Sequence, residues 1–135
     1  MRYQKIESRI WHDEKFNTLT PLQQRLFFYI LTCPHGNLTG LFVLKPGYAG
    51  EDLKCLPKDF TKDLEKLCEM TLVSYDFETS VILIHNFLKH NPITNPNQRK
   101  ALITQISALP KTQLIQKFVG LNPEHAEGLK EVLAK

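Results

Sequence analysis

Three cysteines and five histidines are the side chains of this sequence best suited to bind a metal ion or to act as nucleophile and base. Cys33 and His35 are separated by one residue, whereas Cys55 and Cys68 have no partner at short spacing. Structural zinc sites use paired ligands at close, regular spacings. Cys68 also falls on the apolar side of a helical pattern, where a thiol serves as a small hydrophobic group. We therefore predict no metal site and no cofactor.

The sequence contains none of the short motifs that position a catalytic nucleophile, a zinc-ligand pair or a phosphate-binding glycine loop. The glycines at positions 47 and 50 form too short a segment to cradle a phosphate group. The scattered histidines and carboxylates form no recognisable constellation. We predict that the protein is not an enzyme.

The cysteines are odd in number and have no Cys-x-x-Cys spacing, which argues against a disulfide framework. The N-terminal residues do not resemble a signal peptide. The longest apolar runs, Leu26–Leu31 and Val81–Ile84, are too short to cross a bilayer. We expect a cytoplasmic protein that does not enter a membrane.

Positive charge is unevenly distributed, although the net charge is only +3. Residues 80–123 contain no aspartate or glutamate but five basic residues, namely Lys89, Arg99, Lys100, Lys111 and Lys117. Such a stretch indicates a surface that binds an anion, for which a phosphate backbone is the commonest partner. The alternatives are that the uneven distribution arises by chance, or that the basic residues form a rim that only keeps the protein soluble.

Two groups of residues are candidates for nucleic-acid binding. The first lies on a predicted helix over 57–70, where lysines at i, i+4 and i+8 could reach bases and phosphates in a major groove. It consists of Lys58, Thr61, Lys62 and Lys66. Glu65 and Glu69 share this helix face, so a mixed-charge solvated face with i,i+4 ion pairs is the alternative.

The second group follows a predicted hairpin and begins the next helix, whose first backbone amides favour phosphate. It consists of Lys89, His90, Asn97, Arg99 and Lys100, and we expect it to contribute more than the first. The hairpin tip, Glu78-Thr79-Ser80, carries an acid and no base. We do not expect the tip to enter a minor groove, where proteins usually insert Arg or Lys.

Local patterns predict the elements that position these residues. Thr20, Pro21 and Gln23 form a capping box that begins a helix, which Pro34 and Gly36 end. Further elements are expected as a strand at 40–44, a break at 45–50, a short helix at 51–56, a helix at 57–70 and a hairpin of 73–77 with 81–87.

Toward the C-terminus, Asn95-Pro96 and Asn122-Pro123 predict two helix starts, and a third helical piece around 114–118 ends near Gly120. At the N-terminus, residues 3–10 are expected to form a short strand, followed by a helical turn over 11–16 with Trp11 anchored in the core.

This order of elements predicts a mainly α protein with a small antiparallel sheet, in the α+β class. Helix, strand, two helices and two strands in succession describe a winged helix-turn-helix. We expect this domain to span residues 1–95 and a C-terminal helical extension to span residues 96–135.

Two segments resemble a known family. Ile10-Trp-His-Asp-Glu-Lys-Phe16 followed by Leu19-Thr20-Pro21, together with Ile84-His-Asn-Phe-Leu-Lys-His-Asn-Pro92, is similar to the N-terminal winged-helix domain of phage replication-initiation and replisome-organiser proteins, which are related to DnaD-like proteins. The resemblance implies a role in DNA replication, with DNA and replication proteins as partners and self-association as a homo-oligomer. This chain departs from the family in the weakly basic outer face of helix 57–70 and in the short C-terminal extension.

Two other functions fit the same fold. One is a protein–protein interaction module of a replisome, in which the mixed-charge helix and the C-terminal helices dock another chain. The other is a winged-helix transcription regulator, which normally binds paired half-sites as a dimer.

Overall fold

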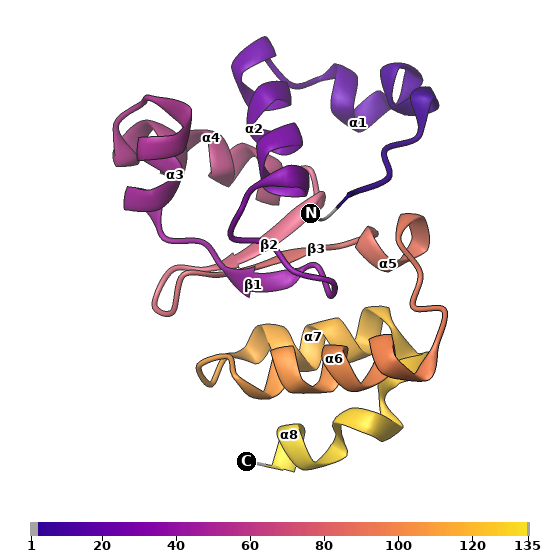
Figure 1. Ribbon diagram of the computed structural model, residues 1–135. Coiled ribbons are helices and arrows are strands. Elements are labelled where there is room, and N and C mark those ends of the chain that lie inside the picture. Colours follow the sequence, from indigo (N-terminus) through magenta and orange to yellow (C-terminus); the bar gives the residue numbers. More distant parts are fainter. Residues whose placement is uncertain (1–2, 135) are drawn as a thin grey trace.

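The computed structural model describes residues 3–134, in which helices surround one small sheet (Figure 1). The helices are α1 (Glu14–Asn17), α2 (Pro21–Thr32), α3 (Pro46–Leu53), α4 (Pro57–Glu69), α5 (Phe87–His90), α6 (Pro96–Ser107), α7 (Gln113–Leu121) and α8 (Lys130–Ala134). The strands are β1 (Leu41–Val43), β2 (Val73–Asp76) and β3 (Val81–Ile84). The predicted class, mainly α with a small antiparallel sheet, is confirmed.

The sheet has the strand order β1-β3-β2, and both pairings are antiparallel. Leu41 pairs with Leu83 and Val73 pairs with Ile84, so β3 lies in the centre and all four of its residues are buried. The hairpin of β2 and β3 is confirmed, but β3 is shorter than predicted. The chain leaves the sheet after Ile84 and forms the helical turn α5 instead of continuing as a strand to Phe87.

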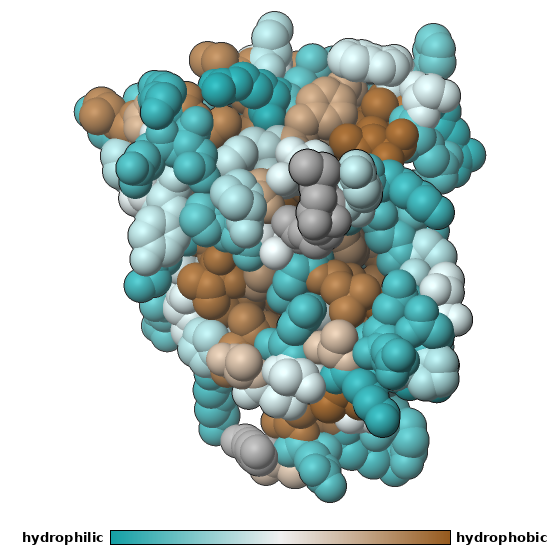
Figure 2. All heavy atoms as spheres, in the orientation of Figure 1, coloured by the Kyte–Doolittle hydropathy of each residue, from teal (hydrophilic) through white to brown (hydrophobic). Residues whose placement is uncertain are grey.

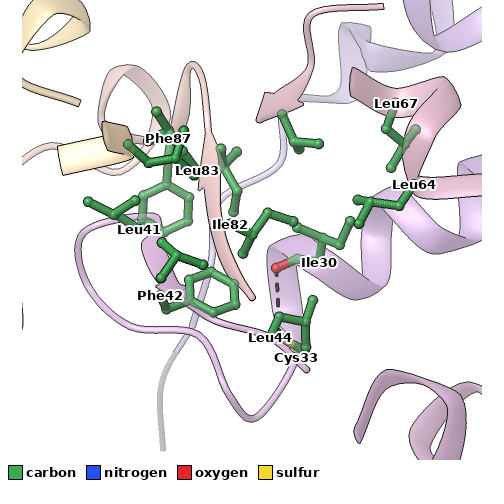
Figure 3. Close-up of a cluster of buried hydrophobic side chains, with 14 of the residues drawn as sticks. Ile30, Cys33, Leu41, Phe42, Leu44, Leu64, Leu67, Ile82, Leu83 and Phe87 are labelled. Atoms are coloured by element: carbon green, nitrogen blue, oxygen red, sulfur yellow. Dashed lines mark hydrogen bonds between the residues drawn. The ribbon is translucent and has the colours of Figure 1, made fainter. Parts of the chain in front are cut away.

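Both faces of the sheet are covered, with α2 and α4 on one side and α6 and α7 on the other (Figure 1). Figure 3 shows Ile82 directed toward Ile30 and Leu64, while Leu41 and Leu83 lie on the opposite side with Phe87. A fully buried side chain of this kind contributes about 1.5–3 kcal/mol to folding.

The helices after residue 96 belong to the same core. Leu102 and Ile106 of α6 and Phe118 of α7 are fully buried in one cluster with residues of the strands. Helix α7 contacts each of the three strands. Helices α6 and α7 therefore pack on the sheet side of the core of their own chain.

Helix starts follow the local pattern closely. The Thr20 hydroxyl accepts a hydrogen bond of 3.2 Å from the Gln23 backbone N–H, and the Gln23 side chain accepts one of 3.0 Å from the Thr20 N–H. This capping box confirms the predicted start of α2. At α6, Asn95 accepts from the Gln98 N–H at 2.8 Å, but the Gln98 side chain accepts from Thr94 instead of Asn95.

The prediction for residues 45–56 is wrong, because α3 begins at Pro46 and runs through both glycines. Proline is well accommodated at the first helical position, where its missing N–H would have no helical partner. A Cβ at Gly50 would lie 2.8 Å from the Cys55 carbonyl oxygen, so this glycine allows a close backbone approach. Lys54, with a φ of 59°, ends the helix in the left-handed region.

The N-terminal prediction is only partly right, because the expected helical turn over 11–16 is found in α1 and in the turn before it, whereas the strand is not. No strand forms at residues 3–10, and a 3₁₀ turn spans Ser8–His12. Trp11 is 59% exposed and is not a core anchor, although its ring contacts Phe16 edge-on at 5.6 Å. This segment makes polar contacts with His90 of α5, through the Glu7 side chain, and with Asn91, through the Lys5 backbone N–H.

The last helix differs from the prediction as well. Two 3₁₀ turns, Pro123–His125 and Glu127–Leu129, precede α8, where one continuous helix was expected. Leu129 is nevertheless buried. Over residues 3–134, no helix combines the length and apolar character needed to cross a membrane.

Candidate nucleic-acid interface

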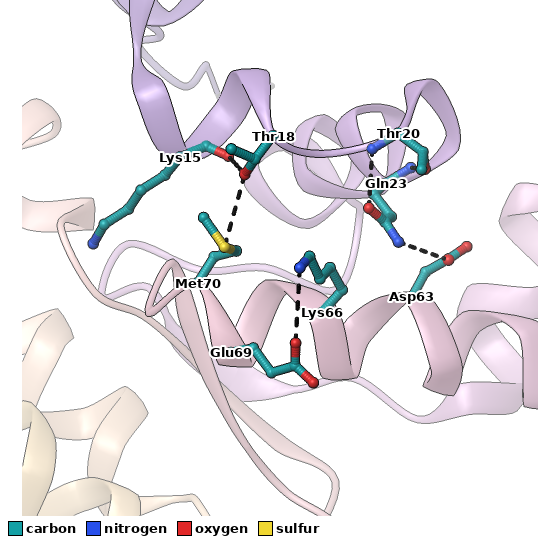
Figure 4. Close-up of polar contacts among 8 residues, drawn as sticks. All are labelled: Lys15, Thr18, Thr20, Gln23, Asp63, Lys66, Glu69 and Met70. Atoms are coloured by element: carbon teal, nitrogen blue, oxygen red, sulfur yellow. Dashed lines mark hydrogen bonds and ion pairs between the residues drawn. The ribbon is translucent and has the colours of Figure 1, made fainter.

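The outer face of α4 carries the first predicted group. Lys58 and Lys62 are exposed, but Lys66 is half-buried and lies 3.8 Å from Glu69 (Figure 4). The Thr61 hydroxyl donates to the Pro57 carbonyl oxygen of its own helix at 3.0 Å. Two of the four residues thus have partners within α4, and this favours the mixed-charge interpretation over a groove-reading face.

The second predicted group lies on α5 and on the first turn of α6. Lys89, Asn97, Arg99 and Lys100 are all exposed, and within residues 3–134 none of their side chains pairs with a carboxylate. In Figure 2, the side of the molecule over α5 and the start of α6 is formed mostly by hydrophilic residues. Three exposed positive charges near one helix start could bind phosphate groups.

His90, the fifth member of this group, has a partner. Its Nδ1 lies 2.9 Å from a carboxylate oxygen of Glu7, and the other oxygen of Glu7 lies 2.6 Å from Nε of Arg9. The Asn91 side chain accepts a hydrogen bond of 2.9 Å from the Lys5 backbone N–H. His90 and Asn91 therefore hold the N-terminal segment against α5.

The remaining basic residues of the acid-free stretch behave differently from one another. Lys111 is exposed before α7, whereas Lys117 donates a hydrogen bond of 2.7 Å to the Ser74 hydroxyl on β2. The expectation that the whole stretch forms a common patch is thus only partly met, because the helical phase of α7 turns Lys117 toward the sheet edge.

A second cationic cluster, which sequence reasoning missed, surrounds His85. Ser74 Oγ lies 2.6 Å from His85 Nε2, and on the other side Lys15 Nζ donates to Thr71 Oγ1 at 2.6 Å. Burial lowers the pKa of His85, and the charges of Lys117 and Lys15 lower it further, against an opposing hydrogen bond to the Thr71 backbone. The sequence carried only a partial signal, since His85 and Lys117 lie in the acid-free stretch but Lys15 does not.

The hairpin tip is fixed by a buried carboxylate. Asp76 is 7% exposed and accepts hydrogen bonds from the hydroxyls of Thr79, at 2.8 Å, and Thr112, at 2.6 Å. These bonds outweigh burial and lower the pKa of Asp76. The tip itself exposes Phe77 and Glu78, and no basic residue.

A cavity of about 480 Å³ lies beneath the N-terminal segment. Phe27 and Leu31 of α2, Ile84 and Phe87 form part of an apolar lining, and Glu7 and His90 lie at its rim. Neither Ser74 nor His85 lines this cavity. Their short contact has the form of a nucleophile beside a base, but it does not open onto this space.

Comparisons of the chain with protein-family models, with curated proteins and with solved structures gave no match.

Proposed function

We propose that this protein is a cytoplasmic, DNA-associated accessory or initiation protein of replication, of the phage replisome-organiser type, built on a winged-helix scaffold. The observation that carries the proposal is the exposure of Lys89, Arg99 and Lys100, which follow the hairpin in the chain and form no ion pair with a carboxylate of residues 3–134. The resemblance of residues 10–21 and 84–92 to that family supports the same role.

The winged-helix interpretation is supported by the element order and by the sheet. One helix precedes β1, the pair α3 and α4 follows, and the hairpin of β2 and β3 closes the sheet in the order β1-β3-β2. In this interpretation α4 is the helix that other members of the fold insert into DNA. The Lys66–Glu69 pair and the exposed Glu65 favour a supporting role for α4 here, with phosphate contacts made by α5 and α6.

The physical basis is counterion release. Each phosphate neutralised by Lys or Arg frees condensed cations, and three such contacts give a slope of about −2.7 for log affinity against log salt on duplex DNA. Binding of this kind depends strongly on salt and weakly on sequence, as phosphate contacts do. A sharp sequence motif selected from a random DNA pool would instead favour the transcription regulator.

The direct test is a titration of labelled duplex and single-stranded DNA over a salt series. We expect the triple charge reversal K89E/R99E/K100E to weaken binding at least about tenfold near 50 mM salt. The matched control K45E/K54E/K130E makes the same change in net charge at exposed positions elsewhere. Equal affinities for the wild type and the first variant would refute this interface.

A second function, a protein–protein interaction module, is favoured by two exposed leucines. Leu22 at the start of α2 is 67% exposed and Leu56 before α4 is 56% exposed. Leu22 lines a groove together with Lys62 and Asp63 of α4. Light scattering would separate the two functions, because a stable assembly without DNA affinity near 50 mM salt favours the interaction module.

A further inference from the structure

Several segments that are distant in the sequence meet at the edge strand β2. Lys15 comes from α1, Thr71 from the turn before β2, Ser74 from β2 and Lys117 from α7, and His85 follows β3. We refer to these five residues as the His85 cluster. None of them belongs to the α5–α6 group, so the inference below does not depend on the proposed function.

The hydrogen bonds define the protonation state of the cluster. Lys117 donates to Ser74 Oγ at 2.7 Å, so the serine O–H is free to donate to His85 Nε2 at 2.6 Å. His85 then accepts as a neutral imidazole, in agreement with its lowered pKa. Figure 4 shows the Lys15 side chain extending away from the contact between Thr18 and Met70.

The charge of the cluster is not compensated. Both lysines act on the same imidazole, and within the described residues neither of them forms an ion pair with a carboxylate. Cys68 lies on the α4 side of the cluster, and its pKa is raised, mainly because the thiol is buried. The charge of Lys117 opposes this shift, and the charge of Glu65 adds to it. Glu65 acts on this thiol, but within residues 3–134 it forms no ion pair with Lys117. Like charges gathered in this way repel each other, and a bound anion relieves the repulsion.

We propose that the His85 cluster binds a phosphate group. Each ammonium group has three donors and uses one of them on a hydroxyl, which leaves donors on Lys15 and Lys117 for phosphate oxygens. When His85 is protonated, its Nε2 can no longer accept a hydrogen bond from the Ser74 hydroxyl. The imidazolium then adds a third positive charge, and the serine O–H can donate to the ligand. Lysine is a frequent phosphate ligand because its charge is compact. The phosphate could belong to a nucleic-acid backbone or to a small phosphate compound.

The test is a titration of the 135-residue chain with inorganic phosphate near pH 6, somewhat below the ordinary histidine pKa of about 6.5, followed by NMR of the imidazole resonances and by calorimetry. We expect phosphate to shift the His85 resonances and to raise its pKa. The variant K15Q/K117Q should bind phosphate at least about tenfold more weakly, because two attractive charges are removed.

The control variant K54Q/K111Q removes the same charge at exposed positions outside the cluster and should stay within about twofold of the wild type. Lys117→Arg keeps the charge and should retain binding, which separates charge from loss of folding. Phosphate that leaves His85 unshifted, or that binds K15Q/K117Q as tightly as the wild type, overturns the proposal.

A short single-stranded oligonucleotide without terminal phosphate distinguishes the two sources. If the oligonucleotide competes with inorganic phosphate in the wild type and this competition is lost in K15Q/K117Q, the site exists and the phosphate that it binds belongs to a nucleic-acid backbone. If K15Q/K117Q loses phosphate binding but binds the oligonucleotide as the wild type does, the site exists and its ligand is a small phosphate compound. Failure of K89E/R99E/K100E to weaken DNA binding affects only the proposed function.

Discussion

Asp76 of β2 accepts a hydrogen bond of 2.6 Å from the hydroxyl of Thr112, the residue that caps α7. The same carboxylate accepts from Thr79 and from the Glu78 N–H inside the hairpin turn. One buried side chain thus joins the hairpin tip to the C-terminal helices. The tip is consequently fixed relative to the layer beneath the sheet.

Replacing Asp76 by Asn should destabilise the fold by about 1–3 kcal/mol, because the neutral amide removes charge-assisted bonds and puts an N–H₂ group where an acceptor is needed. Denaturant unfolding measures the change. The neighbouring variant Glu78→Gln alters an exposed residue and should lose less than about 0.5 kcal/mol. Equal losses in the two variants would contradict the role of Asp76.

The same carboxylate predicts a dependence of stability on pH. Because its pKa is lowered in the folded protein, its contribution is present above the unfolded value of about 3.9 and is lost as the pH falls through the folded value. Thermal unfolding from about pH 5 to pH 2 should therefore show a steeper loss for the wild type than for Asp76→Asn. Parallel curves for the two proteins would show that Asp76 is not linked to this transition.

Removing the Lys117 charge with Lys117→Gln should raise the pKa of His85, because a positive neighbour that disfavours the imidazolium is lost. NMR titration of the imidazole measures this directly. Burial remains in the variant, so the pKa should stay below the ordinary value of about 6.5. Lys111→Gln should leave the titration unchanged, and an effect as large as that of Lys117→Gln would argue for a general charge effect.

Gly40→Ala should be strongly destabilising. Gly40 has a φ of 76°, and a Cβ there would lie 2.5 Å from Cβ of Phe87. We expect a loss of more than about 2 kcal/mol in chemical unfolding, from backbone strain and overpacking. Gly120→Ala is the matched control, since a Cβ at this position of α7 would have nothing within 4 Å. This variant should stabilise the protein by about 0.5–1 kcal/mol, because alanine favours the helix more than glycine does.

Thr20→Ala should lower stability by about 1 kcal/mol, since it removes the acceptor for the Gln23 N–H at the start of α2. Thr20→Ser keeps the hydroxyl and should retain most of the stability. Thermal melts of the three proteins test the prediction, and it fails if serine is no better than alanine.

The elements that the sequence revealed are those set by local interactions. Thr20 and Gln23 lie three residues apart, so the pattern that starts α2 is visible in the sequence and is confirmed. At α3 the local pattern misled, because Gly50 breaks no helix here and instead serves the close approach of Cys55. Trp11 looked like a core residue from its type, yet it is 59% exposed while its ring contacts Phe16 and Phe28.

The candidate sites were harder to predict for a related reason. Exposure of Lys89, Arg99 and Lys100 agrees with their polar sequence surroundings. The partner of His90 is Glu7, 83 positions away, and Lys15 reaches Thr71 across 56 positions. A pairing at such separations leaves no trace in a short stretch of sequence, so the contact by which His90 holds the N-terminal segment could not be predicted.

The double cover of the sheet has a consequence for how the chain can be divided. A fragment ending at residue 95 would retain the hairpin and β1 beside it but would uncover Leu41, Leu83 and the other residues that α7 shields. Several fully buried side chains would face water at once, at a cost of about 25 cal/mol for each Å² of apolar surface. Such a fragment should aggregate or bind hydrophobic dyes, and deletion studies of this protein should preserve α6 and α7.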